Sequence, residues 1–424
     1  MNIALVHPSL ASQGGAENLV MWLAWGLASR GHRVTLFTLD CRPELWKGFQ
    51  SANVRTHVLS TPPLARRIGS RMLNRSCYNA ELGPALDGID VVIAHNYPSY
   101  HWAVGARERR DRGLPVVWYC NEPIRRLYLT RTDAHFLAVA DRSGSRPDLN
   151  RHLVDEARRV QARNARFFKR RRHERARRRD RQQVARLDRV LAISRFTRDN
   201  LAAIFGIAPR VCHPGVARQG APETHGRAEP ARGNGAGRSP VSFLVVGTAA
   251  PKKNLMNVLE AVRLLAGRGG APRITLRIAG PPDAQEMARA HAEQHGLRDR
   301  VEPLGWPSDT ALRRHYASCA ATVYVPIDEP FGLVPVESML EGTPPIVSHH
   351  GGPAEVVEHE RTGLHVDPFD PEAIAAAMAA LADDAPRRRA LGEAGREAAH
   401  AHFTLDRFLD RFEAELAAVR KQEP

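Results

Sequence analysis

Short apolar runs alternate with amphipathic stretches from the N-terminus onward. Residues 3–6 are apolar, residues 12–17 contain a Gly-Gly turn, and residues 18–30 carry apolar side chains at helical spacing. Residues 34–38 are again rich in residues that favour strands. This order of strand, glycine loop, helix and strand predicts a βαβ unit with two parallel strands.

The same alternation predicts further elements downstream. Two buried strands are expected at residues 91–94 and 116–119, with a helix at 102–110 between them. Farther along, strands are expected at 241–246, 274–279, 321–325 and 346–348, and helices at 255–266, 284–295, 335–341, 371–382 and 405–420. Alternating strands and helices predict parallel sheets covered by helices on both faces.

One segment breaks the alternation. Residues 217–240 contain five Gly and three Pro but no Val, Ile, Leu, Met or aromatic residue, so they predict a flexible linker or a long surface loop. We therefore expect an N-terminal domain at residues 1–216, a C-terminal domain at 241–402 and a helix within 403–424. Two such α/β domains enclose a cleft at the carboxyl ends of their strands, where sheets of this kind bind ligands.

Composition and cysteine spacing fit a folded protein of a reducing compartment. The chain has 424 residues, of which 43% are hydrophobic and 25% charged, which suits two domains and argues against wholesale disorder. The five cysteines form no C-x-x-C pair, so they predict neither a disulfide framework nor a zinc site. No basic, apolar leader and no run of 18 apolar residues occurs, so we expect a cytoplasmic protein that does not span a membrane.

Two carboxylates, Glu329 and Glu337, stand eight positions apart around a glycine turn. Gly332 permits backbone N–H groups to face outward, and the N-terminus of the helix expected from residue 335 favours an anion such as a diphosphate. Glu337, about one turn into that helix, is placed to accept hydrogen bonds from two ribose hydroxyls. Spacing alone leaves a second explanation equally open, a surface acid followed by a helix-start acid.

The longer segment of residues 329–368 resembles the donor-binding half of the retaining, nucleotide-sugar-dependent glycosyltransferases of the GT-B type, family 4. The pattern of that family is E-x7-E, G-x-P, GG-x-x-E and T-G. This chain has it at Glu329 and Glu337 and at residues 342–344, 351–355 and 362–363. Further loops of the family are resembled by residues 14–17, 194–216 and 247–254. The resemblance is long and ordered, and only the stretch at about 128–189 and the linker lie outside it.

The resemblance implies an α/β fold of two Rossmann-like parallel-sheet domains that face a cleft, with the last helix crossing back to the first domain. It implies a nucleotide-sugar donor in the C-terminal domain and a glycan or lipid-linked acceptor in the N-terminal one. Transfer is expected to retain the anomeric configuration, with the departing phosphate taking the acceptor proton. No cofactor is implied, and because the chain contains no D-x-D sequence, no metal is expected.

Carried over to this chain, the family pattern assigns catalytic roles to Glu329, which would hold sugar hydroxyls, and to Lys253, which would pair with the donor diphosphate. Lys253 also follows a strand and a Pro-containing turn and opens a helix. That placement by itself offers charge to a phosphate, or simply forms a solvated turn. The expected donor-binding residues are Gly15, Thr248, Lys253, Phe331, Gly332, Leu333, Val334 and Glu337.

The chain departs from the family at two positions. Thr248 stands where the family usually has an Arg, so a second phosphate cation is lacking unless Lys252 replaces it. Residues 119–125 resemble a Y-C-H-x-P-x-R segment of mannosyltransferase-like members, but the His is here Asn121. An Asn can hydrogen-bond a sugar hydroxyl but cannot exchange a proton near neutral pH. The expected contacts to acceptor or sugar are His95, Asn121 and Arg125.

The net charge of +15 is concentrated in one predicted helical segment. Residues 151–190 hold 16 Lys plus Arg against 5 Asp plus Glu, a surplus of 11. A solvated arginine-rich helix explains this as well as any function. As a membrane arm, residues 158–189 would attract anionic lipid headgroups, and as a nucleic-acid module they would bind phosphates without sequence choice. We favour the membrane, because the segment lacks a regular aromatic series for stacking on bases.

The sequence therefore predicts a hexosyltransferase of the cytoplasm or the inner membrane face. It would move a sugar, with mannose favoured, from a nucleotide-diphosphate donor in polysaccharide or glycoconjugate biosynthesis. Two alternatives stay open. One is a sugar-nucleotide-binding protein that has lost catalysis, in view of Thr248 and Asn121, and the other is a nucleic-acid-binding protein that uses the arginine-rich segment without specific recognition.

Overall fold

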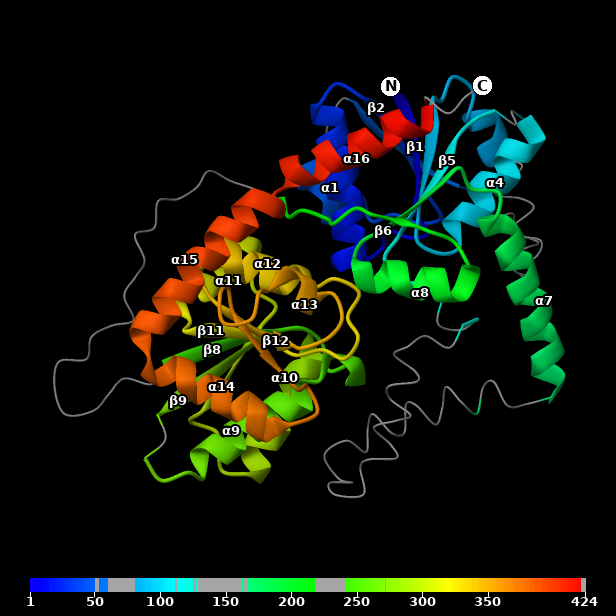
Figure 1. The fold of residues 1–424 in the computed structure, drawn as a ribbon. Coiled ribbons are helices and arrows are strands. Elements are labelled where there is room, and N and C mark those ends of the chain that lie inside the picture. The colour runs from blue at the N-terminus through cyan, green and yellow to red at the C-terminus, as the bar shows by residue number, and fades with distance from the viewer. Residues whose placement is uncertain are drawn as a thin grey trace. The chain divides into compact units, whose positions relative to one another are not determined.

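The computed structural model describes residues 1–49, 53–59, 81–110, 113–124, 127–128, 162, 167–217, 241–270 and 272–420. By their contacts the described residues fall into two compact units. The first is built on residues 1–128, 167–217 and 403–420 within these bounds, and the second on residues 241–402. Each unit is an α/β domain around its own parallel sheet (Figure 1).

The first unit has a seven-stranded parallel sheet in the order β3-β2-β1-β4-β5-β6-β7. Its strands are β1 (Asn2–Val6), β2 (Arg33–Thr38), β3 (Val54–Val58), β4 (Val91–His95), β5 (Val116–Cys120), β6 (Arg189–Ala192) and β7 (Arg210–Val211). The strand order reverses between β1 and β4, so the carboxyl ends of these neighbours form the switch point at which such sheets bind ligands. The four strands predicted in this half of the chain, at residues 3–6, 34–38, 91–94 and 116–119, are confirmed.

The helices of the first unit are α1 (Gly15–Ser29), α4 (Ser99–Arg110), α7 (Phe167–Val184), α8 (Arg195–Phe205) and α16 (Leu405–Arg420), with a short 3-10 segment η1 (Pro43–Phe49). α1 begins three residues before the predicted start, because the Gly14 carbonyl already accepts from Asn18 N–H at 2.9 Å. α8 is capped by the side chain of Ser194, which accepts from Thr197 N–H, and it ends at Gly206 in the left-handed conformation. Both are common ways to satisfy helix termini.

The C-terminal helix α16 returns to the first unit, as predicted, and lies beside α1 (Figure 1). The apolar face of α16 is buried along its length by Phe408, Leu409, Phe412, Leu416 and Val419. At its polar edge, Arg30 of the α1 end lies 2.8 Å from Asp410 and 2.6 Å from Glu413. The buried stripe supplies most of the stabilisation, because partly exposed ion pairs contribute little.

The second unit has a six-stranded parallel sheet in the order β10-β9-β8-β11-β12-β13. Its strands are β8 (Val241–Val246), β9 (Ile274–Ala279), β10 (Val301–Gly305), β11 (Ala321–Tyr324), β12 (Pro345–Ser348) and β13 (Leu364–Val366). Its helices are η3 (Pro251–Lys253), α9 (Leu255–Ala266), α10 (Pro282–Gln294), α11 (Asp309–Ser318), α12 (Leu333–Leu340), α13 (Pro353–Val356), α14 (Pro371–Asp383) and α15 (Ala385–His402). α12 begins two residues before its predicted start, directly after Gly332, whose φ of +94° ends the preceding turn.

Each unit has a hydrophobic core of its own. In the first, buried residues of β1, β4 and β5 pack against Tyr100 and Val104 of α4. In the second, residues of β8 and β9 pack against Leu259 of α9 and Met378 of α14. Among the helices that the structure describes, none is both long enough and apolar enough to cross a bilayer.

Gly215 lies where the returning chain leaves no room for a side chain. A Cβ atom on Gly215 would lie 2.1 Å from the carbonyl oxygen of Thr404, and the next residue, Val216, donates its N–H to Phe403 at 2.9 Å. We expect Gly215→Ala to separate these segments and to lower the free energy of unfolding by about 1–3 kcal/mol. Thermal unfolding followed by circular dichroism measures this as a lower Tm.

The matched control is Gly83→Ala. The nearest atom to a Cβ on Gly83 is the Ala106 carbonyl oxygen at 3.8 Å, which is ordinary contact. The control is therefore expected to keep the Tm of the parent protein, and equal Tm values for the two variants would contradict the close approach of Gly215 and Thr404.

Candidate active site

Lys253 and Glu329 form an ion pair at the carboxyl end of the second sheet. Lys253 ends the turn that follows β8, and Glu329 lies in the loop that follows the neighbouring strand β11. Lys253 Nζ donates to Glu329 Oε2 at 2.9 Å and to the hydroxyl of Tyr324 at 3.4 Å. The two side chains are 24% and 15% exposed, so both charges stay in reach of a ligand. The structure thus brings the two predicted catalytic residues together.

The charge of Lys253 is stabilised in place. Burial alone would lower its pKa, but Tyr324 and Glu329 outweigh this effect and the pKa is raised. The ammonium also lies 5.7 Å from the centre of the Tyr324 ring, within cation–π range. Lys253 is therefore protonated at neutral pH.

Asn254 holds the turn that contains Lys253 in place through its side-chain amide. It is fully buried with φ of +63°, and its side-chain amide donates to the carbonyls of Val325 at 2.9 Å and Pro368 at 2.7 Å. Asn257 in turn donates to Asn254 Oδ1 at 2.9 Å. Sequence reasoning treated Asn254 only as the entry to a helix. The available signal was its residue type, because Asn is among the few side chains enriched in the left-handed region.

The Gly-Gly sequence at residues 351–352 has a steric reason. A Cβ on Gly352 would lie 2.2 Å from Phe331 Cα and 2.3 Å from the Pro330 carbonyl oxygen. Gly352 N–H donates to the carbonyl of Glu329 at 2.7 Å. The loop after β12 therefore packs directly on the backbone that carries Glu329. This contact fixes the position of Glu329 relative to the sheet.

The predicted donor-binding residues of α12 lie around its N-terminus. Gly332 precedes the helix, Leu333 and Val334 are half-buried in its first turn, and Phe331 is only 2% exposed. Phe331 therefore offers almost no surface to a ligand in this structure. Glu337 lies one turn further on.

One oxygen of Glu337 is held within the fold. Tyr316 donates its hydroxyl to Glu337 Oε2 at 2.7 Å. Burial raises the pKa of Glu337, and the hydrogen bond from Tyr316 opposes this. The second oxygen, Oε1, has no hydrogen-bond partner among the residues that the structure describes.

Thr248 shapes the turn after β8. It is half-buried, and its Oγ1 accepts from Ala250 N–H at 3.3 Å. The carbonyl of Lys252 accepts from Ile327 N–H at 2.8 Å, which joins this turn to the loop after β11. Thr248 thus contributes a hydroxyl but no charge beside Lys253.

Sequence reasoning missed a second polar pair next to Glu329. Asp328 is 4% exposed with φ of +50°, and its Oδ1 lies 3.1 Å from His350 Nε2. His350 immediately precedes the Gly-Gly sequence, so the pair links the loops after β11 and β12. Nothing in the spacing of the two residues, 22 positions apart, indicated their contact.

In the first unit, the predicted residues lie at the switch point of the sheet. His95 ends β4 and is fully buried, and its ring contacts His7 Nδ1 at 2.9 Å and Asn121 Oδ1 at 3.1 Å. Gly15 is the exposed first residue of α1. Arg125 lies outside the described residues. His7 was not predicted, although its place at the end of the first strand was a signal equal to that of His95.

The described part of the arginine-rich segment is α7, together with the residues up to 190. Its inner face is anchored by Asp180, which is fully buried. Tyr100 and His101 of α4 each approach Asp180 Oδ1 at 2.6 Å, and the hydroxyl of Tyr128 donates to Oδ2 at 2.8 Å. Three donors on one carboxylate hold the helix to the first unit. Residues 151–161 and 163–166 of the predicted segment lie outside the described residues.

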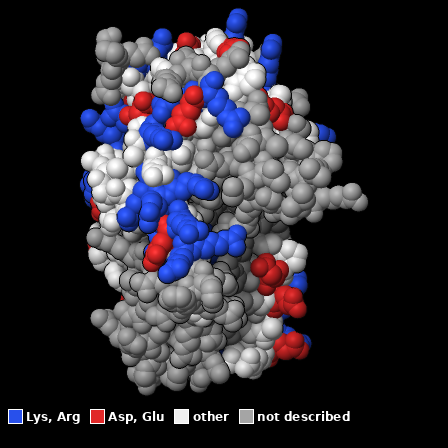
Figure 2. Space-filling view, turned by 90° about the vertical axis from the view of Figure 1, so that its right-hand side faces the viewer, with Lys and Arg blue, Asp and Glu red and all other residues white. Residues whose placement is uncertain are grey.

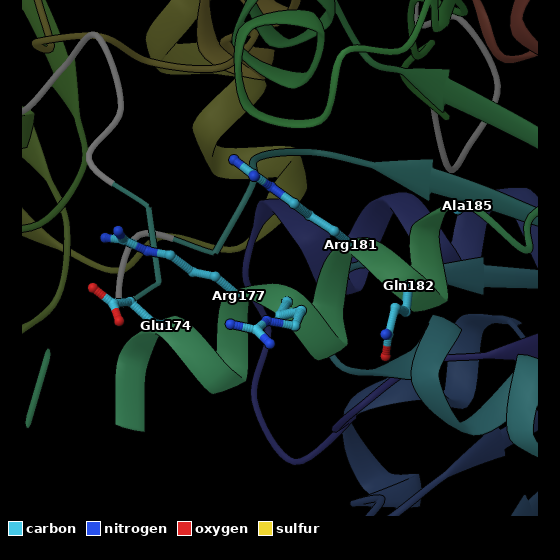
Figure 3. Close-up of a pocket in the computed structure, with 6 residues that line it drawn as sticks. Glu174, Arg177, Arg181, Gln182 and Ala185 are labelled. Atoms are coloured by element: carbon cyan, nitrogen blue, oxygen red, sulfur yellow. The ribbon is translucent and has the colours of Figure 1, made fainter. Parts of the chain in front are cut away.

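The outer face of α7 carries exposed arginines, and Figure 2 shows basic side chains gathered on the side of the molecule where α7 lies. The exposed arginines of the helix are Arg171, Arg172, Arg175, Arg178, Arg179 and Arg181. A hollow of about 530 Å³ runs along one stripe of it, lined among the described residues by Glu174, Arg177, Arg178, Arg181, Gln182 and Ala185. Arg177 and Arg181 extend to the same side of the helix (Figure 3).

No metal site stands out beside these groups. Among the described residues, no cluster of three or more His, Cys, Asp or Glu side chains is arranged to hold an ion.

Two parallel-sheet domains, with a lysine-bearing turn and two carboxylates at the second sheet, are typical of the GT-B class. The chain belongs to the glycosyltransferases of this class. Residues 13–219 match the family described as Glycosyltransferase Family 4, and residues 231–398 match the family described as Glycosyl transferases group 1.

The chain is similar to several characterised and uncharacterised proteins. A glycosyltransferase of Methanocaldococcus jannaschii without characterised activity is 33% identical over 133 residues, which are 31% of this chain and 33% of that protein. A GDP-mannose-dependent alpha-(1-6)-phosphatidylinositol monomannoside mannosyltransferase of Mycobacterium tuberculosis is 30% identical over 229 residues, 52% of this chain and 59% of that protein. The matches thus span about a third to three fifths of these relatives.

A solved structure shows the same fold. The crystal structure of HepE of Anabaena in complex with UDP and glucose superimposes with a TM-score of 0.68 and 18% identity, over 99% of this chain and 100% of that one. At this identity the likeness concerns the fold alone.

The buried histidines give the first unit a pH-dependent stability. Burial lowers the pKa of His7 from 6.5 to about 4, against the opposing effect of the Ser9 and His95 backbones. The unfolded chain takes up this proton near pH 6.5 and the folded chain only near pH 4. Above pH 6.5, the contribution of neutral His7 to the free energy of unfolding is therefore fully present. As the pH falls toward 4, this contribution is lost, which lowers the free energy of unfolding by about 3 kcal/mol.

We expect the drop in Tm between pH 7 and pH 4.5 to be smaller in His7→Leu than in the parent protein. The control is His57→Leu, because the His57 side chain is 47% exposed, whereas that of His7 is buried. Scanning calorimetry at both pH values gives the comparison, and equal drops in all three proteins would contradict the burial of a neutral His7.

Proposed function

We propose that this protein is a retaining hexosyltransferase that moves a sugar from a nucleotide-diphosphate donor to a glycan or lipid-linked acceptor. The observation that carries the proposal is the pair of Lys253 and Glu329, 2.9 Å apart at the carboxyl ends of two adjacent strands. One cation for a diphosphate and one carboxylate for sugar hydroxyls at a single point suit this reaction.

In the proposed reaction, the bond between the anomeric carbon and the donor diphosphate breaks while the acceptor oxygen bonds to the same carbon on the same face. The acceptor proton passes to the departing diphosphate. Lys253 stabilises the charge that develops on this leaving group, as a preorganised cation that needs no rearrangement. The N-terminus of α12 adds partial positive charge to the same end of the sheet.

The remaining groups of the second unit orient the donor. Glu329 accepts hydrogen bonds from sugar hydroxyls, and Glu337 accepts from the ribose through Oε1 while Tyr316 holds Oε2. Glu329 and Glu337 both accept hydrogen bonds from neutral hydroxyls of the donor. They therefore orient the donor without directly repelling its negatively charged diphosphate. We propose that the reaction needs no divalent metal, since Lys253 supplies the positive charge.

For the donor, we favour GDP-mannose. The M. tuberculosis relative is described as GDP-mannose-dependent, and residues 119–125 resemble mannosyltransferase-like members. The Anabaena protein of similar fold was solved with UDP and glucose, so UDP-glucose is the necessary comparison. We place the reaction in the cytoplasm, in polysaccharide or glycoconjugate biosynthesis.

A second candidate function is sugar-nucleotide binding without catalysis. Thr248 favours it, because its hydroxyl is used within the turn and brings no second cation to the diphosphate. Donor binding without transfer to any acceptor would distinguish this function from the first.

The central test is Lys253→Ala and Glu329→Ala. We expect each to reduce sugar transfer at least about 10³-fold while leaving the Tm close to that of the parent, because removing a preorganised transition-state contact costs several kcal/mol. Nucleotide release is measured with a panel of UDP- and GDP-sugars, with extracted lipids present or absent, in EDTA.

The chain offers a closely matched control pair, Arg313 and Glu341. Their N···O distance is also 2.9 Å and their side chains are 28% and 16% exposed, but Glu341 lies beyond the far end of α12. Arg313→Ala and Glu341→Ala are expected to keep transfer activity. Near parental turnover in Lys253→Ala or Glu329→Ala would reject the assignment, and a requirement for added metal would reject the metal-free part of it.

We also propose that α7 attaches the enzyme to an anionic membrane at the inner face. Each exposed arginine near a surface of anionic lipid contributes about 1 kcal/mol, and Asp180 holds the helix with these side chains outward. Such contact would bring the enzyme to a lipid-linked acceptor.

Flotation with vesicles of anionic lipid tests this attachment. The triple variant Arg171→Ala, Arg175→Ala and Arg178→Ala is expected to weaken binding about 100-fold at low salt. The control removes three exposed arginines elsewhere, Arg273, Arg298 and Arg361, whose side chains are 60%, 74% and 73% exposed. Binding of RNA but not of lipid, or equal loss in both variants, would contradict the membrane role.

A further inference from the structure

A buried hydrogen-bonded relay crosses three adjacent strands of the first sheet. His7 follows β1, His95 ends β4, and Asn121 follows β5. His7 Nδ1 lies 2.9 Å from His95 Nδ1, and His95 Nε2 lies 3.1 Å from Asn121 Oδ1. His7 is 3% exposed and His95 is fully buried, so water does not compete for these contacts.

The relay fixes where its hydrogens lie. Asn121 Oδ1 can only accept, so His95 Nε2 carries a hydrogen. Burial lowers the pKa of His95 well below its usual range, and repulsion by a protonated His7 would lower it further, so the His95 ring is neutral and holds one hydrogen. Its Nδ1 is then an acceptor, and the short contact requires that His7 Nδ1 donates.

The other polar groups of Asn121 are also engaged. Its backbone N–H donates to Asn96 Oδ1 at 3.0 Å, and its carbonyl accepts from the hydroxyl of Thr197 at 2.7 Å. With Oδ1 taken by His95, the amide Nδ2 remains, and it has no hydrogen-bond partner within the described part of the chain. Asn121 is half-buried, so these two hydrogens are within reach of a ligand.

We propose that His7, acting through His95, locks Asn121 so that it presents hydrogen-bond donors and selects a ligand oxygen that accepts, such as a sugar hydroxyl oxygen. His7 is thus a positioning residue, and Asn121 is the residue that contacts the ligand. This inference rests on the proposed function, since the ligand is taken to be one of its sugar substrates. The relay orients Asn121 and transfers no proton, because an amide neither gains nor loses a proton near neutral pH.

The first experiment reads the relay without any substrate. The full chain, which has 19 His, is labelled with ¹⁵N-histidine, and long-range ¹H–¹⁵N spectra give the tautomer of each ring. The signals of the two residues are identified by their loss in His7→Asn and His95→Asn. We expect Nδ1–H for His7 and Nε2–H for His95. An Nδ1–H tautomer at His95, or a charged ring at pH 7, would overturn the proposal.

The second experiment measures steady-state kinetics with GDP-mannose and the extracted lipid acceptor, each varied in turn. His7→Leu cannot donate to His95, whereas the amide nitrogen in His7→Asn replaces Nδ1. We expect His7→Leu to raise the KM of one substrate about 3- to 10-fold with little change in kcat, and His7→Asn to restore it. Asn121→Asp keeps an acceptor for His95 but loses both donors, so a larger rise in the same KM is expected.

The outcomes separate the relay from the proposed function. If His7→Leu and His7→Asn lower the Tm alike and change neither KM, then His7 is only a packing residue and the proposal fails. If the parent protein transfers no sugar from any donor, the proposed function fails, while the tautomers still decide whether the relay exists.

Discussion

The contact between Lys253 and Glu329 is the interaction on which the candidate site depends. Removing two charges from water is costly, and such a pair is tolerated only where the geometry is good and further groups support it. Here the supports are backbone contacts: Asn254 ties the lysine turn to the loop after β11, and Gly352 packs on the main chain at Glu329. The rigid elements of the second sheet therefore determine where the two charges lie, and the small residues around the pair are part of the same arrangement.

Much of the fold was predictable because its strands are buried and its helices are amphipathic. The bounds of β8, β9, α9 and α16 agree with the sequence pattern, since each has a strong period and a clear start or stop signal. The elements missed were β3, β6, β7, β10 and β13, and the helices α8, α11, α13 and α15. Several of these strands have only two to four residues, too few for a period to show. The arginines of α7 hid its packing face, because Asp180, a fully buried residue that anchors it, lies among charges of the opposite sign.

The candidate site was predicted only in part for a related reason. Spacing placed Glu329 and Glu337 on either side of a helix start. The family resemblance assigned Glu329 and Lys253 to the same donor site, but their direct contact across 76 positions was not predicted. His7 and His350 were missed because their partners are distant in sequence and are brought near by strand order alone. A side chain at the end of a parallel strand has neighbours that depend on which strands are adjacent, and the linear sequence does not contain that information.

The burial of Asp180 also has a mechanical meaning. Three donors, two on α4 and one on Tyr128, hold the Asp180 carboxylate and prevent α7 from rotating about its own axis. The arginines of α7 therefore keep one orientation relative to the first sheet. Any flat anionic surface that these arginines contact would therefore set the tilt of the whole first unit, together with the ends of β1, β4 and β5. The burial of Asp180 would therefore set the angle between such a surface and the carboxyl edge of the first sheet. It would not determine whether the protein reaches the surface.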